Sequence, residues 1–127
     1  MSSVVLDASA LLAFLRKEPG GEQVQASLSD AVISAVNLSE VLAKASERPG
    51  GFEAAKHALQ GLPIQVVSFD EEQGVIAGGL RLLTRSLGLS LGDRCCLALG
   101  LVQESPVMTT DREWSKLPLG LQIHVLR

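Results

Sequence analysis

The chain has 127 residues, a length that is typical of one domain and can enclose a single hydrophobic core. Hydrophobic residues make up 46% and charged residues 20% of the sequence, which indicates a globular protein and excludes a disordered one. The formal net charge of -3 provides no general basic field. A nucleic-acid partner would therefore need a local basic patch, or metal ions that neutralise local acids.

The start of the chain and its apolar runs bear on its location. Met1-Ser2-Ser3 leads directly into an apolar run and lacks the basic region of a signal peptide. No apolar stretch approaches the ~20 residues that span a bilayer, because Asp93 and Arg94 interrupt the longest one. We therefore expect a cytoplasmic protein with no membrane partner.

Short runs typical of buried strands alternate with longer helical patterns along the chain. The patterns predict, in order, a strand at 4–6, helices at 8–18 and 22–28, a strand at 31–34, helices at 37–48 and 52–60, a strand at 64–67, helices at 70–87 and 89–100, and strands at 106–108 and 121–125. Three glycines in the 70–87 helix each cost about 1 kcal/mol relative to alanine, so we expect close packing against another helix there. This alternation predicts one α/β domain over residues 1–127 with a mainly parallel, five-stranded sheet covered on both faces.

Four acids occupy the starts of helices or the ends of strands. Asp7 follows the first strand, Glu40 and Asp93 lie in the first turns of NLSEVLAK and LGDRCCLALG, and Asp111 follows the fourth strand. The carboxyl ends of parallel strands share one edge of a sheet, where ligands bind. We expect the acids to gather at this edge, and Asp93 joins them if its helix also begins there.

Helix capping is the alternative explanation for the same positions. Asp7 and Asp111 are placed to be N-caps, and two pairs fit the spacing of a capping box: Asn37 with Glu40, and Ser90 with Asp93. Each cap contributes about 1 kcal/mol. Asp70, three residues before Gln73, is an internal comparison that looks like a cap and nothing more.

Carboxylates that gather at one edge repel each other, by about 4 kcal/mol for a pair ~4 Å apart at an effective dielectric constant near 20. The sequence has no nearby lysine cluster, and an all-oxygen acidic site is what Mg²⁺ or Mn²⁺ prefers. Ser9 and Thr109 could add hydroxyl contacts. Arg94 and Arg112 could hold phosphates, or could be solvated surface residues. Such a site suits metal-assisted phosphodiester hydrolysis.

The cysteines and histidines offer no competing site. Cys95 and Cys96 are adjacent, so they do not face each other on a helix and are poorly placed to share a metal. With no other cysteine in the chain, a disulfide framework is excluded, and we expect both to be small buried side chains. His57 and His124 are both far in sequence from the acids.

Four segments together resemble the signature blocks of PIN-domain ribonucleases: VVLDASALLAFL, NLSEVLAK, LGLSLGDRCCLALG and PVMTTDREW. Within that family the chain is similar to VapC-type toxins of prokaryotic toxin–antitoxin pairs. The resemblance implies a PIN-like three-layer α/β/α sandwich and a Mg²⁺- or Mn²⁺-dependent endoribonuclease. It implies a catalytic and metal site of Asp7, Glu40, Asp93 and Asp111, with Ser9 and Thr109 as polar support. It also implies an RNA substrate, a homodimer and a cognate antitoxin whose helical tail occupies an apolar groove near the site. The 70–87 helix is a candidate for part of either protein interface.

Two other functions remain open at this point. A phosphohydrolase that acts on small nucleotides would use the same metal site, and only a comparison of substrates separates it from a ribonuclease. A non-catalytic α/β binding module would contain the same acids as helix caps, and it predicts no effect of divalent metal.

Overall fold

The computed structural model describes residues 3–127 and contains a five-stranded sheet in the order β3-β2-β1-β4-β5. Every neighbouring pair of strands is parallel, as the mainly parallel sheet predicted from the sequence requires. The strands are β1 (Val4–Leu6), β2 (Ala31–Ser34), β3 (Gln65–Val67), β4 (Val107–Thr109) and β5 (Ile123–Val125). Strand β1 lies at the centre, between β2 and β4, where the strand order changes direction.

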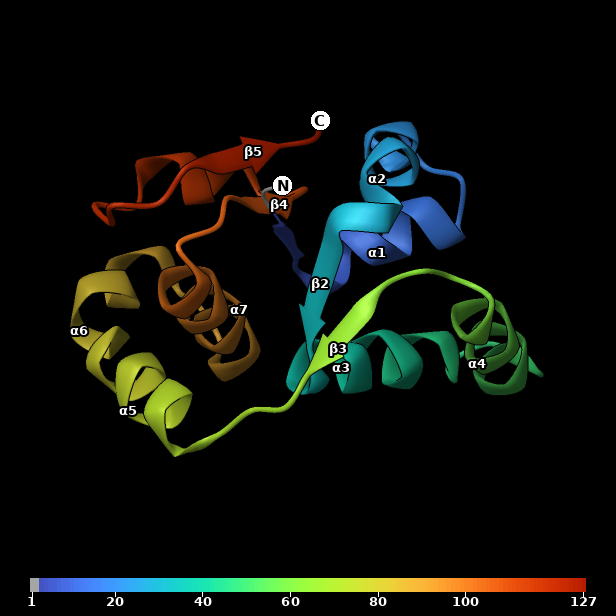
Figure 1. The fold of residues 1–127 in the computed structure, drawn as a ribbon, viewed down its shortest axis with the longest axis horizontal. Coiled ribbons are helices and arrows are strands. Elements are labelled where there is room, and N and C mark those ends of the chain that lie inside the picture. Colours follow the sequence, from blue (N-terminus) through green and yellow to red (C-terminus); the bar gives the residue numbers. More distant parts are fainter. Residues whose placement is uncertain (1–2) are drawn as a thin grey trace.

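Helices cover both faces of this sheet, so the predicted three-layer α/β/α architecture is confirmed. In Figure 1, α5, α6 and α7 lie to the left of the sheet, and α1, α2 and α4 lie to its right. The α-helices are α1 (Ala8–Leu15), α2 (Gly21–Ser27), α3 (Ala35–Ala45), α4 (Gly51–Gln60), α5 (Glu71–Gly79), α6 (Arg81–Thr84) and α7 (Leu91–Gln103). Short 3₁₀ helices are η1 (Leu28–Asp30), η2 (Arg85–Leu87) and η3 (Arg112–Lys116). Among residues 3–127, no helix is both long enough and apolar enough to cross a membrane.

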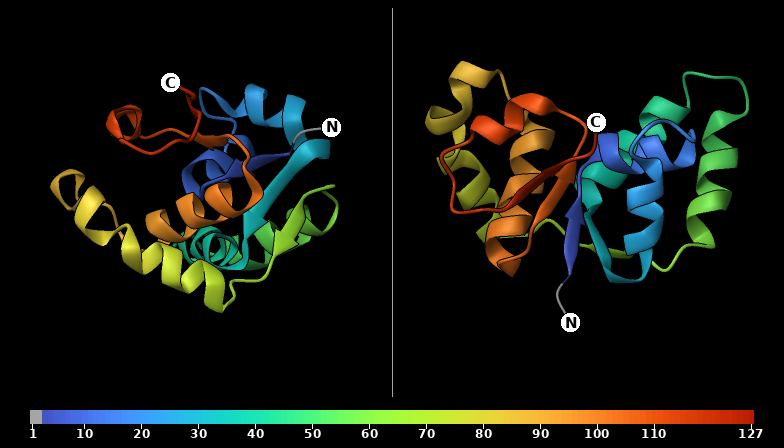
Figure 2. Two further views of the ribbon diagram at one scale, coloured as in Figure 1. Left: turned by 60° about the vertical axis from the view of Figure 1, so that its left-hand side comes forward. Right: turned by 90° about the horizontal axis from the view of Figure 1, so that it is seen from above.

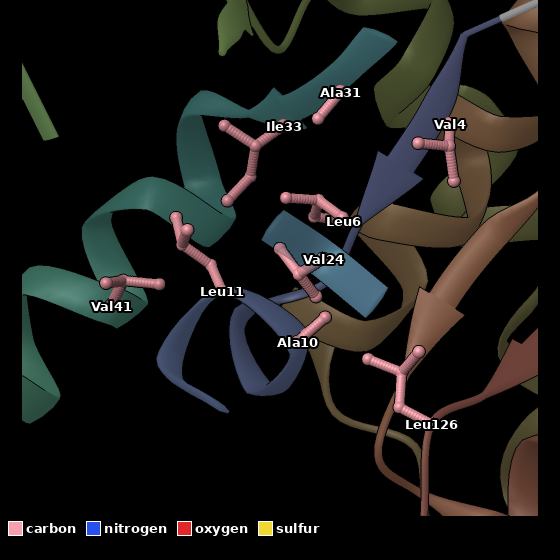
Figure 3. Packing of buried hydrophobic residues seen from close by; sticks show 9 residues of the cluster. All are labelled: Val4, Leu6, Ala10, Leu11, Val24, Ala31, Ile33, Val41 and Leu126. Atoms are coloured by element: carbon pink, nitrogen blue, oxygen red, sulfur yellow. The ribbon is translucent and has the colours of Figure 1, made fainter. Parts of the chain in front are cut away.

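The core has one main cluster on each side of the sheet, because successive strand residues point to opposite faces. Val4 and Leu6 of β1 pack with α1, α2 and α3 (Figure 3). Val5, between them, packs on the other face with Cys96 and Leu97 of α7. The central strand is therefore apolar on both sides, and the first polar side chain after it is Asp7.

The single helix predicted for residues 70–87 is wrong. The chain forms α5, breaks at Leu80, and continues as α6 and η2, which Figure 2 shows as consecutive segments beside α7. A Cβ added to Gly78 or Gly79 would meet no atom within 4 Å, so these two glycines do not mark a close helix contact as expected. They weaken the helix at the point where it ends.

The start of α3 also differs from the prediction. Ser34 is the N-cap, with its side chain accepting a hydrogen bond from the amide of Val36 at 3.2 Å, so the predicted Asn37–Glu40 capping box is wrong. Asn37 instead lies within the first turn of the helix and is buried. Its side chain is therefore available for contacts outside α3.

Candidate active site

The register of the two central strands places Asp7 beside Thr109 at the carboxyl edge of the sheet. Leu6 pairs with Met108, and the amide of Asp7 donates to the carbonyl of Met108 at 3.1 Å. The hydroxyl of Thr109 then donates to Oδ2 of Asp7 at 2.6 Å. Oδ1 of Asp7 accepts from the Ser9 hydroxyl at 2.7 Å and from the Ala10 amide at 2.8 Å, so Asp7 is also the N-cap of α1. Both carboxylate oxygens are held in place.

The carboxylate of Asp7 is in an unfavourable environment for a charge. Only 5% of the residue is exposed, and this burial raises its pKa from 3.8 to about 6. The three hydrogen bonds lower the pKa but do not overcome the desolvation, and the negative charge of Asp93 raises it further. A perturbed carboxyl group at the switch point of a parallel sheet is a typical candidate for a functional group.

Glu40 and Asp93 lie on the same side of the molecule as Asp7, around the buried Cys96. Burial raises the pKa of the Cys96 thiol well above its ordinary value, and the charges of Asp7, Asp93 and Glu40 all add to this rise. Helix α7 thus places Asp93 near Asp7, and its first turn lies against Glu40, whose carboxylate occupies the space where a side chain of Gly92 would be. Asp7, Glu40 and Asp93 are thus all near enough to Cys96 for their charges to act on its thiol.

Asp111 is connected to this group through its backbone and Thr109, not through its carboxylate. Its backbone amide donates to the Thr109 hydroxyl at 3.0 Å, and the amide of Thr110 donates to the Ser9 hydroxyl at 3.0 Å. The side chain of Asp111 is exposed and accepts from the amide of Glu113 at 2.9 Å as the N-cap of η3. Asp111 therefore lies at the border of the site.

The two candidate arginines differ in their surroundings. Arg94 is half-buried and donates from Nη1 to the carbonyl of Ala77 at 3.0 Å, which links α7 to α5. Arg112 is exposed and donates from Nε to the carbonyl of Arg127 at 2.9 Å. Arg94 thus has a structural role that the sequence did not indicate, and contact with phosphate stays a prediction for both. Cys95 and Cys96 are both buried, as predicted.

No cation neutralises the acids among residues 3–127. The ion pairs found in that range involve other carboxylates, those of Glu18, Glu47 and Glu113. Within the same residues, no three acidic, histidine or cysteine side chains are close enough to hold a metal as they are placed. Glu40 is exposed and Asp93 half-buried, whereas Asp7 is buried and its carboxylate accepts three hydrogen bonds. The donor set consists of oxygens and has a net negative charge, which fits Mg²⁺ or Mn²⁺.

Two contributors to the site were missed by the sequence reasoning. The amide of Asn37 donates to Oε1 of Glu40 at 2.8 Å and to the carbonyl of Gly92 at 3.0 Å. Asn37 was interpreted only as a cap, and Gly92 was not singled out. A glycine next to an acid in the first turn of a predicted helix was the one available signal, because glycine is unfavourable there unless another group needs the space.

The chain is similar in sequence to one protein family and in fold to several solved structures. The PIN domain family matches residues 4–119, and no curated protein matches the chain. A chain in the DNA-bound VapBC structure from Salmonella typhimurium has 20% identity and a TM-score of 0.75, with 98% of both chains covered. FitAcB from Neisseria gonorrhoeae has 18% identity and a TM-score of 0.74, with 95% of this chain and 96% of that chain covered. A toxin–antitoxin complex from Klebsiella pneumoniae has 18% identity and a TM-score of 0.73, with 91% and 93% covered. At these identities the likeness establishes the fold.

Proposed function

The chain belongs to the PIN-domain family, and from this premise we propose that it is a Mg²⁺- or Mn²⁺-dependent endoribonuclease, the toxin of a type II toxin–antitoxin pair. The observation that carries the proposal is the buried carboxylate of Asp7. It lies at the switch point of the sheet, its pKa is raised to about 6, and no lysine or arginine of residues 3–127 forms an ion pair with it. A carboxylate that only caps a helix gains no stability from such burial. The charge of a buried metal ligand, in contrast, is stabilised once the ion binds.

Each residue of the proposed site has its own role. Asp7, Glu40, Asp93 and Asp111 would hold the ion, which would supply charge stabilisation at the phosphate and activate a water for attack. Ser9 and Thr109 keep the plane of the Asp7 carboxylate fixed through their hydrogen bonds. This preorganisation matters because a ligand that is already oriented loses little rotamer freedom on binding. We propose that Arg112, which is exposed next to Asp111, attracts phosphate.

The first experiment measures cleavage of RNA with and without Mg²⁺ or Mn²⁺ for the wild type and Asp93→Asn. Asparagine can still accept the hydrogen bond from the Ser90 amide, which measures 2.9 Å, so the substitution keeps the capping box and removes the charge. We expect a loss of cleavage of at least about 100-fold, because the loss of a residue that only orients a ligand already costs about 10- to 100-fold. Asp70→Asn is the matched control, because Asp70 caps α5 through the amide of Gln73 at 2.9 Å and lies outside the site.

The outcomes separate the three candidate functions. Equal cleavage by the wild type and Asp93→Asn would exclude the metal site, whereas no cleavage by the wild type with either metal would favour a binding module. Cleavage of mononucleotides in preference to RNA and single-stranded DNA would indicate a small-nucleotide phosphohydrolase. Divalent metal should also raise the melting temperature of the wild type by mass action, and an unchanged melting temperature at millimolar metal would contradict the proposed site.

We also propose a cognate antitoxin as partner, a homodimer as the assembled form and the cytoplasm as location. The support is that the similar structures described above include VapBC and a toxin–antitoxin complex.

An apolar groove between α1 and α4 contains Leu12, Leu15 and Ala58, with Arg16 and Arg48 beside them. This groove suits an amphipathic helix with acidic residues at its edge. Leu82 of α6 is 78% exposed, and we propose α5 and α6 as the dimer surface. Co-purification with the product of the adjacent reading frame and measurement of the mass in solution test these assignments.

A further inference from the structure

We infer that Asn37 is a positioning residue, which together with the missing side chain of Gly92 holds the Glu40 carboxylate against the first turn of α7. The inference rests on the proposed metal site and assigns two residues outside the predicted acidic set. It starts from the place of Asn37 in the fold. Asn37 is 1% exposed and lies on α3, one turn before Glu40, at the contact between α3 and α7.

The amide of Asn37 connects two elements of the site at once. Nδ2 donates both to Oε1 of Glu40 at 2.8 Å and to the carbonyl of Gly92 at 3.0 Å. Gly92 directly precedes Asp93, so a single amide group links Glu40 to the backbone next to Asp93. Its own Oδ1 is buried without a hydrogen-bond partner among residues 3–127.

Because Gly92 has no side chain, the carboxylate of Glu40 can lie directly against this part of α7. A Cβ at this position would lie 2.5 Å from Cδ and 2.7 Å from Oε1 of Glu40, closer than atoms approach in proteins. Glu40 itself is exposed, and its carboxylate ends a flexible side chain. Without the hydrogen bond from Asn37 and the gap at Gly92, the carboxylate would be free to turn into solvent. Together these two features hold an otherwise mobile ligand beside Asp93.

The test measures Mn²⁺ binding in the absence of RNA, by the free-ion signal in electron paramagnetic resonance, alongside the melting temperature without metal. We expect Asn37→Ala to weaken Mn²⁺ binding by about 10- to 100-fold, as is typical when a residue that orients a ligand is lost. Gln73→Ala is the matched control. Gln73 is also a buried amide with one hydrogen bond to a backbone carbonyl, that of Ser68, and with an unpaired oxygen, but it lies on α5. It should lower the melting temperature and leave Mn²⁺ binding unchanged.

Gly92→Ala tests the position of the Glu40 carboxylate separately from the stability of the protein. Alanine favours the helix, so the melting temperature should not fall, whereas the new Cβ displaces Glu40 and should weaken Mn²⁺ binding by a similar factor. Gly78→Ala is the control, because a Cβ there meets no atom within 4 Å. In a Glu40→Gln background, Asn37→Ala should cause little further loss, since both substitutions act on the same ligand.

Each outcome is decisive. If the wild type binds no Mn²⁺, the proposed function fails and this inference fails with it. If the wild type binds Mn²⁺ and Asn37→Ala binds it equally well, only the positioning role is overturned. Additive losses in the Glu40→Gln background would also overturn it, because Asn37 would then act independently of Glu40.

Discussion

Replacement of Asp7 by asparagine should make the protein more stable at neutral pH in the absence of divalent metal. Most substitutions of buried, hydrogen-bonded residues destabilise, so the expected direction is unusual. It follows from burial, which raises the pKa of Asp7 from 3.8 to about 6. The folded protein therefore favours the neutral form of this side chain, and asparagine is a neutral side chain of nearly the same shape.

The magnitude follows from the two pKa values. Each unit corresponds to about 1.4 kcal/mol, so the charged carboxylate costs about 3 kcal/mol of stability above pH 6. Between pH 6 and 3.8 the folded state takes up the proton first, so the wild type should become more stable as the pH falls through this window. Asparagine keeps an acceptor for the amide of Ala10 and the hydroxyl of Ser9, but it presents an NH₂ group to Thr109. We deduct about 1 kcal/mol for that change and expect a net gain of about 2 kcal/mol at pH 8.

The assay is urea denaturation of the wild type and Asp7→Asn in the presence of a chelator, at pH 8 and pH 4. The difference should be about 2 kcal/mol at pH 8 and should disappear or change sign at pH 4, where the wild-type carboxyl is protonated in the folded state. Asp70→Asn, an exposed cap, should show no comparable gain at pH 8. If Asp7→Asn is less stable than the wild type at pH 8, the hydrogen bonds of the carboxylate outweigh the cost of burying its charge.

Three further predictions concern single hydrogen bonds. Thr109→Val removes the hydroxyl that donates to Asp7 at 2.6 Å and should lower the free energy of unfolding by about 1–3 kcal/mol at pH 8, and a change below about 0.5 kcal/mol in urea denaturation would contradict this. Ser90→Ala removes half of the capping box of α7 and should cost about 1 kcal/mol, measured in the same way, while a neutral result would mean that the helix start is held by packing alone. Arg94→Met removes the bond to the carbonyl of Ala77 and should lower the melting temperature, and an unchanged melting temperature would contradict this structural role; a shallower salt dependence of RNA binding in the same variant would show that Arg94 also contacts phosphate.

The sheet and most helices were predictable because their signals are local. The strand at 4–6 is apolar on both faces, as expected for a central parallel strand, and turn residues such as Pro49-Gly50 mark helix ends. Parallel topology predicted that Asp7 and Glu40 lie at one edge, because it places the ends of strands and the starts of the following helices there. Asp93 was expected to join them only if its helix also begins at that edge, since this helix follows another helix. The assignment of these acids as metal ligands stays a prediction.

The errors occurred where two local signals compete. Ser34 and Asn37 are both good N-caps, and the choice between them depends on where β2 ends, which is set by its pairing with β1 and β3. The break at Leu80 was missed because the apolar spacing continues through Gly78 and Gly79. The role of Asn37 was missed for a different reason. Its partner Gly92 is 55 positions away, and a hydrogen bond between two helices does not change the pattern of apolar residues in either helix.

Capping and metal binding are compatible explanations for most of the acids. Asp93 accepts from the amide of Ser90 through Oδ2, and Asp111 accepts from the amide of Glu113 through Oδ1. Among the hydrogen bonds of residues 3–127, the other oxygen of each carboxylate accepts none. A cap that fixes one oxygen therefore also directs the second, and that second oxygen is available to a cation. For these two residues, capping through one oxygen and binding a cation through the other are geometrically compatible.

Asp7 is the residue that capping does not explain. Its bond to the amide of Ala10 measures 2.8 Å, and the equivalent bond from the amide of Gln73 to Asp70 measures 2.9 Å. The two caps are the same in kind, yet Asp70 is exposed and Asp7 is 5% exposed. An exposed cap stabilises its helix without the desolvation cost, so helix formation alone gives no reason to bury Asp7 beside Asp93. Binding a divalent cation does give one, because an ion held by a fixed, poorly hydrated carboxylate displaces little water from it.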